Sequence, residues 1–423
     1  MLKIRIKKLK KTHLLNLFLV GSLLIIAVVL KINHIELIAL TLTLFIILKK
    51  ARFSYFSIFS FILWFSFLQE YFASINTMFS SGRLKWDTSI AIYHSELFLC
   101  EIIFYIIELI FFFTTDVLEN EKILYKCDLN ISKKMAYIFV TCGFILIVLA
   151  YPSLPTFNTE LERDMGIVPS SLVVPLSMLL LGVTYDWLKK GWYFRIITFI
   201  SLFWVMFHGD RVIVLGYVVY FILKYINNAN EDFKTLKSII FSKRVFFILI
   251  VIFVAVIISI RVQYTRSGNV YDLNFETLLL NLLKQGTAAD VVHVFNCATD
   301  MWQNGQGLNG YSYLYYLDNI LPSANPNLYS AVILQKNYNT MGGGLFFAEP
   351  MMNGGMLLCI VQSVVYIAIL VWAFNKKNSY HAYVIIPFSI LIFRFAWYAT
   401  CAGLVKMLIY YVPFVYFVSK KIK

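Results

Sequence analysis

The fold is decided by one long polar stretch inside an otherwise apolar chain. Residues 261–345 read RVQYTRSGNVYDLNFETLLLNLLKQGTAADVVHVFNCATDMWQNGQGLNGYSYLYYLDNILPSANPNLYSAVILQKNYNTMGGGL. Charged residues, aromatic residues and glycines alternate throughout, so this stretch cannot lie within a bilayer as one or more apolar helices of about 20 residues. A protein that only spans the membrane has no reason to keep such a segment. We therefore expect recognition or chemistry there, against the membrane surface.

The rest of the chain has the composition of an integral membrane protein. Of its 423 residues, 60% are hydrophobic and 14% charged, and the mean hydropathy is +0.74. Apolar runs broken by short basic turns predict an all-α, polytopic membrane protein that forms a single integral-membrane domain over residues 1–423. No small-residue cleavage site follows the first run, so we expect a retained helix rather than a signal peptide. The twelve expected spans are 14–30, 35–48, 53–75, 92–114, 135–151, 172–188, 193–207, 212–226, 245–260, 346–374, 382–399 and 403–419.

The basic residues predict the orientation of these spans. With a cytoplasmic N-terminus, 26 of the 37 Lys and Arg residues fall in the inside segments and nine in the outside segments. This asymmetry follows the positive-inside rule. We therefore expect the cytoplasmic membrane as the location, both termini in the cytoplasm, and residues 261–345 as a long external (periplasmic or extracellular) loop containing short helices. The net charge of +14 is then mostly a topology signal and gives no reason to expect a nucleic-acid partner.

Several classes of function find no support in the sequence. The six cysteines form no CxxC pair, and of them we place only Cys297 in an outer loop, so no disulfide framework is expected. No His, Cys or Asp cluster has the spacing of metal ligands, and no glycine-rich phosphate loop follows a strand. The expected inside segments are short, which excludes a cytoplasmic ATPase or soluble glycosyltransferase domain. We expect no cofactor and no metal.

Three arginines on the expected outer side are candidates for binding an anion. Arg211 ends the turn Phe207–Arg211, and Arg261 and Arg266 lie where the ninth span emerges. Guanidinium groups suit phosphate, and outward turns of this chain mostly avoid cations. The alternatives are a simple hairpin turn at Arg211 and interfacial snorkelling of Arg261 and Arg266.

Two helical patterns lie within the external loop, at 275–284 and 287–302. In the second, an apolar stripe predicts an amphipathic helix on the membrane surface; its members are Ala288, Val291, Val292, Phe295, Ala298 and Trp302. His293 and Asp290 lie beside this stripe. His293 is a candidate catalytic residue, although a lone histidine is more often a surface or satisfied residue.

Two charged residues fall at or within expected spans. Glu349 follows the flexible Gly342–Gly344 and begins a span, where a carboxylate is costly unless it is paired or lines water. It is a candidate catalytic residue, and the alternative is a helix-start charge favoured by the macrodipole. Arg394 lies deep in a span and is a candidate for substrate binding. Its alternative is a buried ion pair with Glu349, Glu101 or Glu108.

The order of these landmarks carries a resemblance to a known family. They are Gly209–Arg211, Arg261 with Arg266, Gly310–Leu314, the stretch Leu321–Pro326, Gly342–Gly344 with Glu349, and Asn353–Gly355. Along nearly the whole chain this arrangement resembles the oligosaccharide repeat-unit polymerases, the Wzy-type O-antigen and capsule polymerases. Two departures are Ser323 and Asn325, which replace Arg and Lys that family members often carry, and Pro350 after Glu349.

The resemblance implies metal-independent glycosyl transfer in lipopolysaccharide or capsule synthesis at the outer face of the cytoplasmic membrane. A growing glycan on undecaprenyl pyrophosphate would move onto the terminal sugar of a lipid-linked repeat unit, with release of undecaprenyl pyrophosphate. Arg211, Arg261, Arg266 and Arg394 would bind pyrophosphate or substrate. Glu349 or His293 would act as the general base. The implied partners are the lipid-linked oligosaccharide, membrane lipids, a chain-length regulator and a flippase.

Other functions stay open from the sequence. A lipid-linked oligosaccharide flippase or another transporter is the main alternative from a different class. Transporters usually show repeated halves and broken helices, and the sequence has no internal repeat. An O-antigen ligase of similar architecture would use the same charges for a different acceptor.

Overall fold

The structure, a computed structural model, shows only helices as regular elements in the part of the chain that it describes. The described residues are 9–75, 90–126, 131–154, 170–208, 211–229, 287–315, 330–338, 340, 344–375 and 407–421. The expectation of an all-α fold is confirmed for these residues. The chain divides into two compact units. The first consists of Met1–Lys122, Asn274–Lys377 and Ser389–Val405, and the second of Ile123–Leu273, Asn378–Phe388 and Lys406–Lys423.

Five helices within the described residues are long and apolar enough to cross a membrane. They are α1 (Lys11–Leu30), α3 (Tyr55–Ile75), α4 (His94–Thr114), α6 (Lys133–Ala150) and α17 (Ala348–Asn375). These helices indicate a multi-pass membrane protein. Every expected span that falls in the described residues coincides with a helix, including the weak second one at α2 (Asn33–Ala51). The spans expected at 245–260 and 382–399 lie outside the described residues, so the total of twelve stays a prediction, as does the sidedness.

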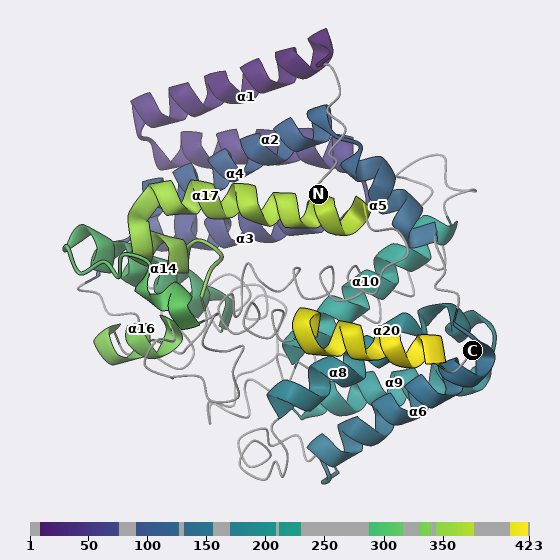
Figure 1. Cartoon of the computed structure of the whole chain (residues 1–423). Helices are drawn as coiled ribbons and strands as arrows, with labels where there is room; N and C mark the ends of the chain where they lie inside the picture. Colours follow the sequence, from purple (N-terminus) through teal and green to yellow (C-terminus); the bar gives the residue numbers. More distant parts are fainter. Residues whose placement is uncertain are drawn as a thin grey trace, which may run out of the picture. The chain divides into compact units, whose positions relative to one another are not determined.

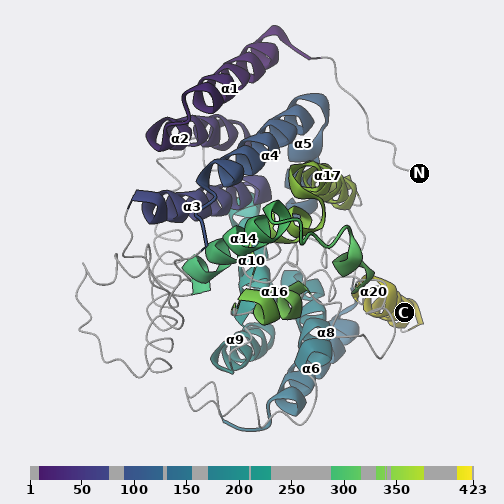
Figure 2. The same cartoon turned by 90° about the vertical axis from the view of Figure 1, so that its left-hand side faces the viewer.

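In the first unit, α1 to α4 and the long arm of α17 stack side by side (Figures 1 and 2). Apolar side chains of α1 such as Phe18 and Val29 are exposed, as expected of a helix that faces lipid. At one end of the stack, α14 (Thr287–Gln303) packs against α17, α3 and α16 (Ser330–Tyr338). The short helix η2 (Tyr311–Tyr313) also contacts α17 there.

An aromatic core holds α3, α4 and α17 together. Phe59 stacks on Phe104 with ring centroids 4.8 Å apart and on Tyr366 at 5.0 Å. The hydroxyls of Tyr55 and Tyr366 are hydrogen-bonded at 2.6 Å. Offset and edge-on ring pairs of this kind add to the area that they bury. The core therefore fixes the position of α17 against α3 and α4, and α17 carries Glu349.

We use the term "α14 end" for the end of this stack where α2 begins, α3 ends, α4 begins and α14 lies. Hydrogen bonds join these elements, since Asn33 Nδ2 donates to Ser74 Oγ at 3.0 Å and the Tyr93 backbone N–H donates to Asn296 Oδ1 at 3.0 Å. The turn between α1 and α2 lies at this end, as do the end of α3 and the start of α4. The expected topology places this end outside.

The second unit contains α6, α8, α9, α10 and α20. Their bounds are α8 Ser170–Val183, η1 Tyr185–Lys189, α9 Trp192–Phe207, α10 Arg211–Ala229, and the π-turn η4 Met407–Tyr411 continuing into α20 Val412–Lys421. Ser132 caps α6, because its side chain accepts a hydrogen bond from the Met135 N–H. A Cβ at Gly182 would lie 2.6 Å from the Tyr217 ring, so α8 and α10 approach closely at this glycine.

Candidate functional site

The site is built around a break in α17. Gly355 has φ 60° and ψ −150°, a conformation that is essentially restricted to glycine, and it separates a short arm, Ala348–Asn353, from the long arm. A Cβ at Gly355 would lie 2.5 Å from Trp302 Nε1, so α14 packs directly under the break. Pro350 lies in the first turn, where no helical hydrogen bond needs its missing N–H. The break turns the short arm towards the segment around η2.

Glu349 lies at the centre of a buried hydrogen-bond network. Its Oε1 accepts from Ser312 Oγ at 2.9 Å and from Ser330 Oγ at 2.5 Å. Asn353 Nδ2 donates to Ser312 Oγ at 2.7 Å and to the Glu349 carbonyl at 2.8 Å. All four side chains are at most 2% exposed. Glu349 is in the first turn of α17, where the helix macrodipole favours a negative charge, which was the alternative to a catalytic role. It also joins two other segments of the chain.

Backbone contacts hold the segment around η2 against the short arm. The Gly310 N–H donates to Asn353 Oδ1 at 3.0 Å, and the Leu308 N–H donates to the Met352 carbonyl at 2.8 Å. Gly310, at φ 88°, makes the turn that brings Ser312 back towards Glu349. The landmarks Gly310–Leu314, Glu349 and Asn353–Gly355, which carry the family resemblance, therefore meet in one place.

The helix α14 confirms the predicted helix at 287–302, and its location on the membrane surface stays a prediction. Val291, Val292, Phe295 and Ala298 of the apolar stripe are buried, and so are residues beyond the stripe, namely Val294, Asn296, Cys297, Thr299 and Met301. The helix is thus packed on more than one side, against α17, α3 and α16. Trp302, the last stripe residue, is 37% exposed although it packs against Gly355.

His293 and Asp290 lie on this helix. His293 is half-buried, and its Nε2 is 3.6 Å from Cys297 Sγ, one helical turn away. The side chain of Asp290 and the whole segment 275–284 lie outside the described residues. The structure therefore gives His293 a local contact within α14, whereas the contacts of Glu349 are with the η2 segment and α16.

Asp300 ties α14 to its neighbours. It accepts hydrogen bonds from Tyr93 OH at 3.1 Å, Tyr338 OH at 3.1 Å and Asn304 Nδ2 at 2.9 Å. Burial and then the hydrogen bond to Asp300 raise the pKa of Tyr93 from 10.0 to about 12, and the same causes raise the pKa of Tyr338. Both tyrosines therefore stay neutral donors at physiological pH.

The arginine candidates are not brought together within the described residues. Arg211 is the first residue of α10, and its side chain is not among those described. Arg261, Arg266 and Arg394 lie outside the described residues altogether, so their roles stay predictions. Of the partners considered for Arg394, Glu108 accepts from Ser60 Oγ at 2.7 Å, and Glu349 is engaged by two serines.

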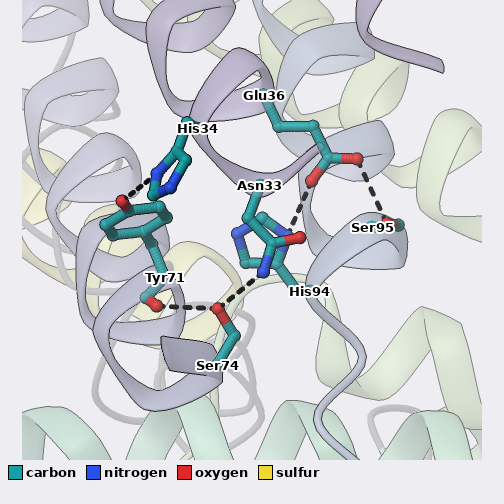
Figure 3. Close-up of polar contacts among 7 residues, drawn as sticks. All are labelled: Asn33, His34, Glu36, Tyr71, Ser74, His94 and Ser95. Carbon is teal, nitrogen blue, oxygen red and sulfur yellow. Dashed lines mark hydrogen bonds and ion pairs between the residues drawn. The ribbon is translucent and has the colours of Figure 1, made fainter. Parts of the chain in front are cut away.

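The sequence reasoning missed a polar cluster at the α14 end (Figure 3). Glu36 Oε2 is 2.6 Å from His94 Nδ1, and Glu36 Oε1 accepts from Ser95 Oγ at 3.1 Å. Beside this pair, His34 Nδ1 contacts Tyr71 OH. The available signal was the presence of His34, Glu36 and His94 at the expected outer ends of neighbouring spans, but each one alone looks like an ordinary interfacial residue.

It also missed a buried ion pair in the second unit. Lys224 Nζ is 2.8 Å from Asp186 Oδ1, and the two side chains are 0% and 7% exposed. From the sequence, Lys224 is one of the basic residues of the expected inside segments.

Comparison with known proteins identifies no relative. No protein-family model matches the chain, and neither a curated protein nor a solved structure matches it.

Proposed function

We propose that the chain is a membrane glycosyltransferase that polymerises undecaprenyl-pyrophosphate-linked oligosaccharide repeat units at the outer face of the cytoplasmic membrane. The product is O-antigen or capsular polysaccharide, and undecaprenyl pyrophosphate is released. The observation that carries this proposal is the network at Glu349. It joins landmarks that are related in the sequence only by their order along the chain. Ser312 and Glu349 are 37 residues apart.

The chemistry of the network fits glycosyl transfer. A glycosyl group that leaves a pyrophosphate passes through a transition state with positive, oxocarbenium-like character, which a nearby carboxylate stabilises. The hydroxyl groups of Ser312 and Ser330 fix the position of the Glu349 carboxylate. Because these donors occupy Oε1, we favour a role for Glu349 in placing its negative charge and holding the η2 segment. Proton abstraction falls to another group.

The leaving group is the second requirement. An activated lipid pyrophosphate needs no nucleotide, and cations that bind the departing phosphate can replace a metal. Arg211, Arg261, Arg266 and Arg394 are our candidates for this role, and His293 stays a candidate for proton transfer. The external position of residues 261–345 is part of the same proposal.

One observation favours a second function, that of a lipid-linked oligosaccharide flippase. Secondary transporters bind substrates where membrane helices are discontinuous, and α17 is broken at Gly354–Gly355 beside a buried carboxylate. A polymerase and a flippase differ in where repeat units stop. A blocked polymerase leaves single units on the outer face, whereas a blocked flippase leaves them on the cytoplasmic face.

The test is Glu349→Gln in cells whose own polymerase gene is deleted. Glutamine keeps the shape and loses the negative charge, so we expect long chains to disappear and single repeat units to accumulate on the outer face. We expect the rate of polymer formation to fall by about 100- to 1000-fold, equivalent to about 2–4 kcal/mol in the activation free energy. Glu96→Gln is the matched control, because Glu96 is a half-exposed carboxylate at the same end that contacts Gln303.

Three outcomes would contradict the proposal. Wild-type chain length in Glu349→Gln would remove this residue from the reaction. Accumulation on the cytoplasmic face would favour the flippase. Attachment of finished chains to lipid A core without any lengthening would instead identify a ligase.

A further inference from the structure

The polar cluster at the α14 end contains a histidine that is oriented on one side and unsatisfied on the other. His94 is 5% exposed and Glu36 1% exposed. Glu36 Oε2 lies 2.6 Å from His94 Nδ1 as an ion-pair contact, without the geometry of a hydrogen bond. A carboxylate this close to Nδ1 favours the proton on that nitrogen, which leaves a lone pair on Nε2. It is buried and has no hydrogen-bond partner among the described residues.

Glu36 itself is held firmly as the orienting group. It lies in the first turn of α2, and Ser95 at the start of α4 donates to its second oxygen. Figure 3 shows the two carboxylate oxygens directed to His94 and Ser95. The carboxylate therefore lies where the first turns of α2 and α4 meet. The negative charge of Glu36 would in turn stabilise a positive charge forming on the imidazole.

The remaining surroundings of His94 are aromatic. The Phe67 ring centroid is 4.7 Å from that of His94 and the Tyr71 centroid is 6.1 Å away, both on α3. Ionisable groups near this end of the stack include His34 on α2, Glu70 on α3, Glu96 on α4 and Asp300 on α14. A buried acceptor nitrogen without a partner costs free energy, which a ligand that donates an O–H would recover.

We propose that Glu36 and His94 form a proton-accepting dyad for a sugar hydroxyl. This inference rests on the proposed glycosyl transfer and assigns its general base. The acceptor hydroxyl donates its proton to His94 Nε2 while its oxygen forms the new bond to the anomeric carbon. The bond from that carbon to the pyrophosphate breaks, and undecaprenyl pyrophosphate leaves with the electron pair. The imidazolium, stabilised by Glu36, returns its proton to external water.

The dyad can be connected to the Glu349 network through α14. Tyr93, which precedes His94, donates to Asp300, and the Tyr93 N–H donates to Asn296 of the same helix. Trp302, further along α14, packs under the break at Gly355. One rigid helix therefore positions the proposed base and the proposed charge-stabilising carboxylate within the same unit.

The test is the pH dependence of chain lengthening by the purified full-length protein, with lipid-linked repeat units as substrate. The wild-type rate should fall as the pH is lowered, because a protonated imidazole cannot accept the proton. His94→Gln should lower the rate by about 10²-fold or more and abolish this acid limb. Glu36→Gln should lower the rate less and shift the acid limb to lower pH, because the carboxylate no longer stabilises the imidazolium.

His34→Gln is the matched control. His34 is an exposed histidine in the same cluster, with Tyr71 rather than a carboxylate as its partner. It should keep the wild-type rate and the wild-type acid limb. The amount of folded protein in the membrane, measured for every variant, separates chemistry from folding, and Glu36→Gln tests the dyad if His94→Gln does not fold.

The failure of the dyad and the failure of the proposed function give different results. If the wild type lengthens chains and both dyad variants keep its acid limb, the dyad is a structural link between α2 and α4 and the inference is wrong. If the wild type lengthens no chains at all, the proposed glycosyl transfer is wrong, and so is the proposed role of the dyad.

Discussion

Two buried carboxylates, one from each unit, are stabilised in different ways. In the second unit, Asp186 is paired with the Lys224 ammonium at 2.8 Å, and Lys224 Nζ also lies 5.2 Å from the centre of the Tyr185 ring. In the first unit, Glu349 is held by the hydroxyls of Ser312 and Ser330. An ion pair cancels its own charge, whereas hydroxyl groups fix a carboxylate and leave its charge in place.

This difference bears on which buried carboxylates only stabilise the fold and which can act on a substrate. A buried pair such as Asp186 and Lys224 is sensitive to the loss of one partner, but it offers no net charge to a ligand. The α14 end of the first unit gathers Glu349, Asp300 and the dyad of Glu36 and His94, which contact hydroxyl, amide and imidazole groups. The proposed chemistry uses these carboxylates, and the following changes test that distinction.

The largest expected effect on stability is at Lys224. Lys224→Met leaves Asp186 as a buried charge without its partner and should lower the free energy of unfolding by about 3–5 kcal/mol. The double variant Lys224→Met/Asp186→Leu removes both charges and should return to the wild-type value or above it. Chemical denaturation in detergent micelles measures both. Lys190→Met, at an exposed lysine over Trp187, is the control. Equal effects of Lys224→Met and Lys190→Met would show that the buried pair is not structural.

The break in α17 should be the next most sensitive position. Gly355→Ala forces a side chain into a backbone conformation at φ 60° and against Trp302 at 2.5 Å. We expect a loss of about 2–3 kcal/mol, because strain of this kind and the displacement of Trp302 add together. Gly21→Ala is the control, since a Cβ there meets nothing within 4 Å, and it should stabilise α1 slightly. A Gly355→Ala protein as stable as the wild type would indicate an unbroken helix.

The smallest expected effect is at Tyr93. Tyr93→Phe removes a hydrogen bond to Asp300 and should cost about 0.5–1.5 kcal/mol. The raised pKa of Tyr93 also predicts a pH dependence. The contribution of the Tyr93 hydroxyl to the free energy of unfolding is fully present below pH 10.0. It is lost as the pH rises towards about 12, because Tyr93 releases its proton at a lower pH in the unfolded chain than in the folded one. Denaturation at pH 9 to 12 should show this decline in the wild type and a weaker one in Tyr93→Phe. Exposed Tyr311→Phe should leave the decline unchanged.

Much of the fold could be predicted from the sequence because long apolar runs have only one stable arrangement in a bilayer. The helices α1, α2, α3, α4 and α6 begin and end within a few residues of the expected spans. The packing of α14 could not be predicted, because its apolar stripe suggested one buried face. Cys297, Asn296 and Thr299 on its other faces are covered by neighbouring helices, which no local pattern reveals.

The site could be predicted only in part, for the same physical reason. Glu349 stood out because a carboxylate at the start of a span needs a partner. Its partner Ser312 is 37 residues away, and Asn353 reaches Ser312 across 41 residues, so tertiary packing alone decides these bonds. The dyad was missed because Glu36 and His94 belong to different spans. Neither residue has a neighbour in sequence that signals the other.

The activity that we propose for this chain is the lengthening of a lipid-linked glycan without a nucleotide. The most direct measurement uses the purified protein in liposomes that contain lipid-linked repeat units and no other protein. Chain length and released undecaprenyl pyrophosphate are followed together. We expect products of increasing length, with one undecaprenyl pyrophosphate released for each unit added, and neither product in the Glu349→Gln protein. Repeat units that cross the bilayer unchanged, with no release of the lipid pyrophosphate, would show that the chain does not polymerise them.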